Sequence, residues 1–286
     1  MKRINFFSTK IVIALCGIFL ILVCCLIFSY ISYRDKTVPV LLYHGVGRED
    51  AKNWGDLNLL ITPETFEEQI KYLHEHGYKI VSVEEVSKRL RMNEDVKKYI
   101  AITFDDGYLN NYIHAFPILK KYAATATFYI IPDVIASHGY TGGTAKHMND
   151  SQIKEMVKAG IRIGSHTMSH CDLTSIREED YQKELAESKR LLEQRFKTHI
   201  ESIAYPYGLY NEKILNLVKE YGYKEGVTTN LGVNTKKTYD KNPMVLYRIG
   251  IFNEIDGIKG FLRTIEYGRL VGFFSNLWYE IENFLR

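Results

Sequence analysis

The chain has 286 residues, 46% of them hydrophobic and 25% charged, which is an ordinary globular composition with ample length for one large core. Three basic side chains in the first ten residues account for the whole formal net charge of +3, so the rest of the chain balances at zero. A nucleic-acid-binding protein would need a basic stripe, and the sequence therefore argues against a nucleic-acid partner.

The first 33 residues differ from the rest. Residues 1–10 are basic, and residues 11–33, "IVIALCGIFLILVCCLIFSYISY", carry no charge. A run of this length can cross the roughly 30 Å hydrocarbon core as a helix, and its basic flank favours a cytoplasmic N-terminus with the remainder outside the cell. The sequence therefore predicts an uncleaved signal anchor in the cell membrane. A cleaved signal peptide is the alternative, but no small-x-small cleavage site follows, and a lipoprotein would need a small residue where Val23 stands.

Beyond residue 34 the chain alternates short apolar runs with amphipathic stretches. Thr62 is placed to cap a helix that stops at Gly77, and Ser82 with Glu85 forms a capping box. In chain order, the expected strands are 38–46, 78–83, 99–104, 124–131, 161–166, 200–205, 223–229 and 244–251, and the expected helices are 62–77, 82–90, a segment ending at 121, 150–160, 177–196 and 211–222.

This repetition of strand and helix predicts parallel strands with helices outside them. With about seven or eight such units, a closed or nearly closed barrel is favoured over an open sheet. The expected fold class is therefore α/β, a (β/α) barrel of seven or eight strands after an N-terminal transmembrane helix. In such barrels the chemistry lies where strands end and loops begin.

The C-terminal tail, residues 256–286, is rich in Leu, Phe and Trp at helical spacings. It predicts an amphipathic helix. We favour a final helix packed on the barrel, and the alternative is a helix that contacts a membrane surface or a partner.

Two motifs at expected strand ends carry charged and metal-binding side chains. The strand "YIAITF" runs into Asp105 and Asp106, whose mutual repulsion in a partly desolvated strand mouth requires a compensating cation. The motif "SHTMSH" supplies His166 and His170, and two imidazoles with one carboxylate form a three-ligand metal site that leaves a position for water. Asp106 is the expected third ligand, which leaves Asp105 as a base for that water. A turn aspartate and two histidines on a solvated helix are the alternatives.

The motifs "TFDDG", "HTMSH" and "AYPYG", in this order, resemble those of the metal-dependent polysaccharide deacetylases of the NodB-homology family. The resemblance covers about residues 38–251. It implies a distorted (β/α) barrel that removes N-acetyl groups from glycans, usually with zinc. It also implies these roles: catalytic base for Asp105, metal ligands for Asp106, His166 and His170, a loop-bracing hydroxyl for Thr167, and, in the turn Pro206–Tyr207, an oxyanion-binding N–H on Tyr207.

Three features depart from the family pattern. Ala204 stands where many members carry an arginine, no Asp-x-Asp-Trp segment is apparent, and no histidine follows His199. His44 in "VLLYHGV" offers a general acid, because a Tyr-His pair at this position resembles the subgroup that acts on poly-β-1,6-N-acetylglucosamine. Arg248 in "LYRIGI" would then pair with Asp105 in place of the missing arginine. A structural strand-end histidine and a barrel-closing salt bridge are the alternatives for these two.

The sequence thus predicts a membrane-anchored extracellular enzyme that deacetylates an N-acetylated glycan with one divalent metal ion, zinc first. Poly-β-1,6-N-acetylglucosamine is the first expected substrate, and peptidoglycan and chitin oligomers come next. The alternatives are an inactive glycan-binding surface protein and a hydrolase of a non-glycan amide on the same barrel. The expected organisation is a cytoplasmic tail over 1–10, an anchor over 11–33, a deacetylase domain over 34–255 and a helical tail over 256–286.

Overall fold

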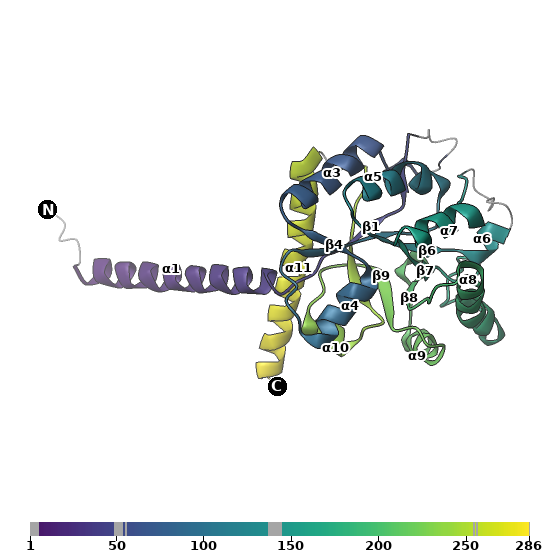
Figure 1. Ribbon diagram of the computed structural model, residues 1–286. Coiled ribbons are helices and arrows are strands. Elements are labelled where there is room, and N and C mark those ends of the chain that lie inside the picture. Colours follow the sequence, from purple (N-terminus) through teal and green to yellow (C-terminus); the bar gives the residue numbers. More distant parts are fainter. Residues whose placement is uncertain are drawn as a thin grey trace.

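The structure is a computed structural model that describes residues 6–48, 54, 56–136, 145–253, 255 and 257–285. Figure 1 shows a barrel of strands surrounded by helices, from which one long N-terminal helix projects. A second long helix, at the C-terminal end of the chain, lies between that projection and the barrel.

Seven parallel strands close the barrel, which confirms the predicted fold class. Closure occurs at the first strand, which pairs with the last strand on one side and with a central strand on the other. A further short strand, β4 (Lys79–Val81), pairs only with the first half of that central strand. In barrel order the seven are β1 (Val40–Tyr43), β10 (Leu246–Gly250), β9 (Glu225–Leu231), β8 (Ser202–Ala204), β7 (Arg162–Ser165), β6 (Thr127–Ile130) and β5 (Tyr99–Phe104).

The expected strand over 38–46 is divided in the structure. It supplies β1 and then, after His44, the short strand β2 (Gly45–Val46), which leaves the barrel to pair with β3 (Leu60–Ile61). Gly45 leaves room for the ring of Trp54, since a Cβ at this position would lie 2.2 Å from that ring. The break places His44 at the mouth of the barrel.

The outer helices begin and end mostly where the sequence signals indicate. The Thr62 hydroxyl accepts a hydrogen bond from Thr65 N–H, and Ser82 accepts one from Glu85 N–H. The Glu85 carboxylate pairs with Arg89, so the expected capping box is present only in part. The helices are α3 (Pro63–Glu75), α4 (Val83–Met92), α5 (Phe116–Lys121), α6 (Pro132–Ala136), α7 (Asp150–Lys158), α8 (Ser188–Phe196), α9 (Glu212–Glu220) and α10 (Lys236–Lys241), with short 3-10 turns at Leu57–Leu59, Glu178–Asp180 and Pro206–Gly208.

Two helices contain a wider π-type turn that the sequence analysis did not anticipate. These turns are Asn111–Ala115, before α5, and Gln182–Glu187, before α8. Each carries a buried polar side chain, Asn111 and Glu184 respectively, that reaches a loop at the barrel mouth. The expected single helix over 177–196 is therefore irregular, in keeping with the frequent occurrence of π-turns at functional sites.

The barrel interior is filled at one end and polar at the other. At the N-terminal end, small and branched side chains such as Val40, Ala101 and Leu246 pack against Val86 of α4. This helix closes the N-terminal mouth of the barrel. Nearer the opposite mouth lies the fully buried side chain of Arg248. The C-terminal ends of the strands are thus left for polar groups.

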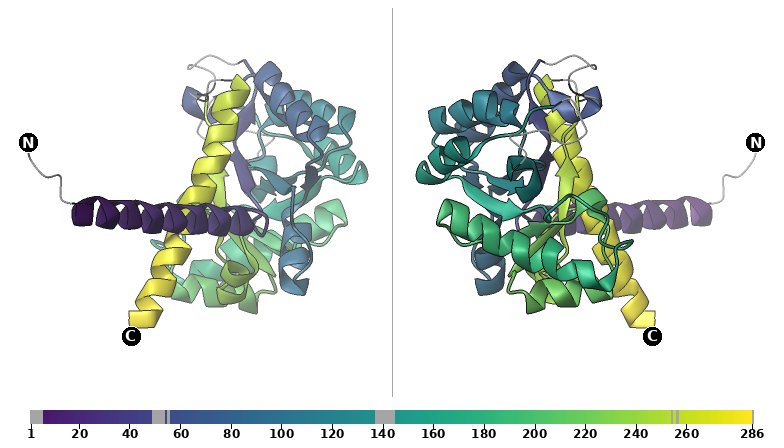
Figure 2. Two further views of the ribbon diagram at one scale, coloured as in Figure 1. Left: turned by 90° about the vertical axis from the view of Figure 1, so that its left-hand side faces the viewer. Right: turned by 90° about the vertical axis from the view of Figure 1, so that its right-hand side faces the viewer.

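The two long helices meet at one side of the barrel (Figures 1 and 2). α1 (Phe6–Arg34) contains a 24-residue segment, Ile11–Arg34, whose mean hydropathy of 3.4 and length would allow it to cross a membrane. α11 (Gly257–Leu285) is the predicted tail helix, and it packs on the barrel through buried side chains that include Phe261 and Ile265. Gly268 of α11 lies directly against Ile249 of β10.

Candidate active site

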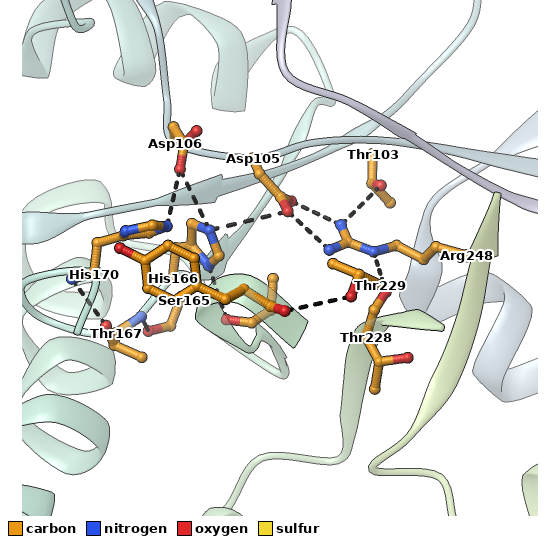
Figure 3. A network of polar contacts seen from close by, with 12 residues as sticks. Thr103, Asp105, Asp106, Ser165, His166, Thr167, His170, Thr228, Thr229 and Arg248 are labelled. Atoms are coloured by element: carbon orange, nitrogen blue, oxygen red, sulfur yellow. Dashed lines mark hydrogen bonds and ion pairs between the residues drawn. The ribbon is translucent and has the colours of Figure 1, made fainter. Parts of the chain in front are cut away.

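Polar residues from two strand ends converge at the C-terminal mouth of the barrel (Figure 3). Asp105 and Asp106 follow β5, His166 follows β7, and His170 lies four residues further along the same loop. Parallel strands end at the same rim, so residues that directly follow these strands are brought together. The structure therefore gathers the two sequence motifs into one site.

Asp106, His166 and His170 form a cluster that could hold a metal ion, with ligand atoms all within 4.8 Å of one another. Both imidazole Nε2 atoms lie 3.4 Å from Asp106 Oδ1. Zinc binds such nitrogen and oxygen ligands at roughly 2.0–2.1 Å in tetrahedral geometry, which separates neighbouring ligands by about 3.3 Å. The spacing of the three side chains therefore fits one small divalent cation.

The surrounding hydrogen bonds hold two of these side chains in the orientation that a metal requires. His166 Nδ1 lies 2.8 Å from the carbonyl oxygen of Ala204, and an N–H at Nδ1 leaves the Nε2 lone pair directed at the cluster. The Tyr108 hydroxyl donates to Asp106, and burial together with the negative charge of Asp106 raises the pKa of Tyr108 well above its usual value. Tyr108 therefore stays protonated as a donor.

Asp105 lies outside the cluster and is held by Arg248 (Figure 3). The two guanidinium nitrogens of Arg248 lie 2.7 Å and 2.8 Å from the two carboxylate oxygens of Asp105. Arg248 also donates to Thr228 O and to Thr103 Oγ1. Burial alone would raise the pKa of Asp105, but the charges of Arg248 and His166 and the hydrogen bonds from Arg248 outweigh burial and lower it. Asp105 is therefore an ionised carboxylate, and Arg248 holds both of its oxygens in place.

Four of the site residues hold their backbone in the left-handed region without being glycine. These residues are Asp106 at φ +68°, Thr167 at +62°, His170 at +61° and Tyr207 at +58°. Such conformations cost free energy for residues that carry a Cβ. Glycine would adopt this conformation more easily at all four positions. Each position nevertheless has a residue that contributes a side chain or a backbone N–H to the site.

The loop between the two histidines is braced from two sides. Thr167 Oγ1 accepts a hydrogen bond from the backbone N–H of His170. The carboxylate of Glu184, only 5% exposed, accepts hydrogen bonds from the N–H groups of Met168 and Ser169 and from the Ser169 hydroxyl. The loop that presents His170 is therefore tied to the π-type turn before α8.

The remaining residues that the sequence analysis singled out also lie near the cluster. His44 is close enough for its charge to act on both Asp105 and Asp106, and its Nδ1 is buried without a hydrogen-bond partner in the described chain. Tyr207 directly follows Pro206, is 63% exposed, and its ring lies 4.9 Å from the ring of His170. The ring of Tyr207, on the Pro206–Gly208 turn, therefore forms one aromatic edge of the site.

The sequence analysis missed several residues that shape the site. Glu184 lies in a segment with an ordinary helical sequence pattern, so the neighbouring residues do not indicate that its side chain is buried. Asn111 accepts from Val46 N–H and donates to the carbonyl of His44, and thereby fixes the backbone that carries this histidine. Tyr108 directly follows the "FDDG" motif, and this position could have indicated that it belongs to the site. The ring of Trp54 lies 4.4 Å from that of Tyr108.

Comparison with known proteins identifies the family. The polysaccharide deacetylase family profile matches residues 92–226. The chain is 34% identical over 227 residues to YxkH of Bacillus subtilis (strain 168), which bears the name of a polysaccharide deacetylase, and the match covers 78% of this chain and 75% of YxkH. It is 28% identical over 214 residues to the poly-β-1,6-N-acetyl-D-glucosamine N-deacetylase of Staphylococcus aureus (strain MRSA252), covering 68% of this chain and 73% of that protein.

Solved structures agree with this result. The deacetylase PplD of Streptococcus pyogenes, determined in complex with acetate, superposes with a TM-score of 0.72 at 32% identity, over 80% of this chain and 98% of PplD. The polysaccharide deacetylase BC0361 of Bacillus cereus gives a TM-score of 0.70 at 31% identity, over 80% of this chain and 69% of BC0361. IcaB of Ammonifex degensii, at 23% identity and a TM-score of 0.68, shares the fold over 82% of this chain and 97% of IcaB. The chain therefore belongs to the polysaccharide deacetylase family and is a hydrolase of that family.

Proposed function

We propose that this protein removes N-acetyl groups from an N-acetylglucosamine polymer outside the cell, with one divalent cation, zinc first, held by Asp106, His166 and His170. The observation that carries the proposal is the cluster itself, whose ligand atoms lie within 4.8 Å of one another beside a separately held carboxylate. When bound, such a cation polarises the acetamide carbonyl and lowers the pKa of the attacking water.

In this proposal Asp105 is the catalytic base. It lies 3.9 Å from His166 Nε2 and is therefore next to the cluster without belonging to it. Its ionised carboxylate accepts a proton from the water that attacks the acetamide carbon. Arg248 positions the carboxylate by its two-pronged contact, so that one geometry is available for proton transfer.

Two further groups complete the proposed reaction. The backbone N–H of Tyr207, set by the turn after Pro206, donates to the oxyanion that develops on the carbonyl oxygen. Protonated His44 donates a proton to the departing amine. The C–N bond of the acetamide breaks, and the products are acetate and a free amino sugar. Thr167 contributes by holding the loop that carries His170.

For the substrate we propose poly-β-1,6-N-acetylglucosamine first, with peptidoglycan and chitin oligomers next. The support is the Staphylococcus aureus relative that bears this polymer in its name, together with the position of His44 after β1 and the pairing of Arg248 with Asp105. The relation to that protein is distant, so the polymers must be compared directly.

We also propose that α1 spans the cell membrane, with residues 1–10 in the cytoplasm and the deacetylase domain, 34–255, outside. The support is the apolar segment Ile11–Arg34, whose most apolar 18-residue stretch has no residue buried in the described chain. Its basic N-terminal flank favours this orientation. α11 then belongs to the extracellular side.

The experiment that tests this function is acetate release by the full-length protein in detergent from the three polymers. We expect release from one polymer to exceed release from the others, and we expect Asp105→Asn to abolish it. Asp95→Asn, which alters an exposed aspartate far from the site, is the matched control. Release from a small acetamide but from none of the polymers would instead favour a non-glycan amide, and binding of a polymer without release would favour a glycan-binding role.

A further inference from the structure

One face of α11 is apolar and exposed over residues 267–281. Tyr267, Leu270, Phe274, Trp278 and Ile281 are all exposed, Trp278 at 71% and Phe274 at 53%. Their spacing of three and four residues places them in one stripe along the helix. An exposed aromatic stripe of this length on a helix end is unusual for a surface that meets only water.

The opposite face of α11 is already occupied by the barrel. Phe261, Ile265 and Phe273 are buried, and Gly268 and Gly272 allow close approach to Ile249 and Val233. The exposed stripe therefore does not compete with the contacts that hold α11 in place. It is a second apolar face, directed away from the barrel.

The base of α1 is fixed to α11. The rings of Tyr30 and Tyr33 lie 5.3 Å and 5.4 Å from the ring of Phe273, and the Tyr30 hydroxyl donates to Glu266. Figures 1 and 2 show α11 crossing the base of α1 at the side of the barrel from which α1 projects. The face of α11 that points away from the barrel therefore points toward the side on which α1 enters a bilayer.

We propose that the exposed face of α11 lies in the interface of the same phospholipid membrane that α1 spans, on its outer side. This inference rests on the proposed membrane span. A helix that lies in the interface buries an apolar face at the boundary between headgroups and acyl chains. Tyr and Trp are the side chains that favour this depth. The exposed stripe of α11 contains Tyr267 and Trp278, and Tyr30 and Tyr33 lie where α1 contacts α11.

Two further observations favour lipid over a protein partner. The stripe continues the exposed apolar surface of α1, since the two helices are in contact at Phe273. Toward its N-terminal end the stripe carries the exposed basic side chains of Lys259 and Arg263, which suit phosphate headgroups. The outer leaflet thus meets a surface that is apolar at one end and basic at the other.

The consequence is a fixed orientation of the enzyme. With α1 as the only membrane contact, the barrel could rotate and tilt relative to the membrane. A second contact through α11 holds the barrel against the membrane in one orientation. The deacetylase then acts on polymer close to the cell membrane.

The two tryptophans of the chain, Trp54 and Trp278, make a direct test possible. In the full-length Trp54→Phe variant, Trp278 is the only tryptophan. The protein is reconstituted in vesicles of phosphatidylcholine and phosphatidylglycerol that contain lipids brominated either near the headgroup or near the bilayer centre. We expect blue-shifted Trp278 emission, quenched more strongly by bromine near the headgroup. Water-like emission that neither lipid quenches would overturn the proposal.

Controls separate this inference from the proposals on which it depends. In the same variant, Phe274→Glu with Ile281→Glu should abolish the quenching, whereas Ile113→Glu, on an exposed apolar residue of another helix, should leave it unchanged. Retention of the chain after alkaline extraction tests the span independently, and acetate release by protein with Trp54 intact tests the enzyme. Retained, active protein with unquenched Trp278 refutes the α11 contact alone, and extraction of the chain refutes span and contact together.

Discussion

Arg248 and Asp105 form a buried, two-pronged ion pair between residues 143 positions apart in the sequence. The pair joins the last barrel strand to the loop after β5, and both side chains are almost fully inaccessible. A pair of this kind fixes the direction of the carboxylate as well as its charge.

We therefore expect Arg248→Lys to reduce kcat/KM by about 10- to 100-fold, because lysine cannot make two parallel hydrogen bonds to one carboxylate. Arg248→Ala should also destabilise the protein by about 3–5 kcal/mol, since it leaves a buried charge without its partner. Initial rates and thermal melts of both variants test this, with Arg177→Lys, an exposed and ion-paired arginine, as a surface control. Full activity in Arg248→Lys would show that the pair acts only in stability.

The metal cluster is tested by removing one ligand at a time. His170→Ala should lower the bound metal content of the purified protein well below one ion per chain and reduce acetate release by at least about 100-fold, because two ligands hold a divalent cation poorly. His74→Ala, on the exposed side of α3, should change neither quantity. Elemental analysis beside the rate measurement gives the answer. An unchanged metal content in His170→Ala would remove this residue from the ligand set.

Glu184 should act on the metal site without touching it. Glu184→Gln keeps the size of the side chain but replaces an acceptor of three hydrogen bonds with a weaker one, so the loop carrying His170 loosens. Changes in such supporting groups commonly weaken metal binding by about 10- to 100-fold. Competition with a chelator measures the metal Kd, and the exposed Glu187→Gln is the control on the same turn. An unaltered Kd would limit Glu184 to a role in folding.

The buried Glu225 makes stability depend on pH. Burial, together with the charges of Glu84 and Glu201, raises its pKa to about 8, and its Oε1 has no hydrogen-bond partner among the described residues. Because the folded-state pKa is raised, the native protein holds this proton more tightly than the unfolded chain does. The free energy of unfolding therefore falls as pH rises from about 4.5 to about 8.

The substitution Glu225→Gln should remove this fall in the free energy of unfolding between about pH 4.5 and about pH 8. We expect the variant to exceed the parent in free energy of unfolding by on the order of 3 kcal/mol near pH 8 and to match it near pH 4.5. Denaturant titrations at both pH values measure the difference, and Glu220→Gln, at an exposed position, should show none. An equal effect of Glu225→Gln at both pH values would mean that the carboxyl is not protonated in the native state.

The sequence predicted the barrel because the buried strands are continuous apolar runs and the outer helices have clear caps, as at Thr62. It placed Asp105, Asp106, His166 and His170 together because each motif follows a strand, and parallel strands end at one rim. The division of 38–46 into two strands was not predictable, because β2 is defined by its pairing with the distant residues Leu60 and Ile61.

The supporting residues were not predictable for a similar reason. Glu184 becomes buried only because a π-type turn directs it at the loop after β7. Asn111 reaches the backbone of His44 across 67 residues of sequence. Local patterns report which face of an element is apolar, but they do not report which distant loop a single polar side chain will contact.

Metal-dependent deacetylation can be tested by removing the metal from the protein and returning it. Full-length protein is stripped of metal with a chelator, divided, and assayed for acetate release from poly-β-1,6-N-acetylglucosamine before and after one equivalent of zinc is added, beside Asp105→Asn and His44→Ala. We expect no release from the stripped protein, recovery with zinc, and no recovery in either variant. Undiminished release from stripped protein that elemental analysis shows to be free of metal would contradict this expectation.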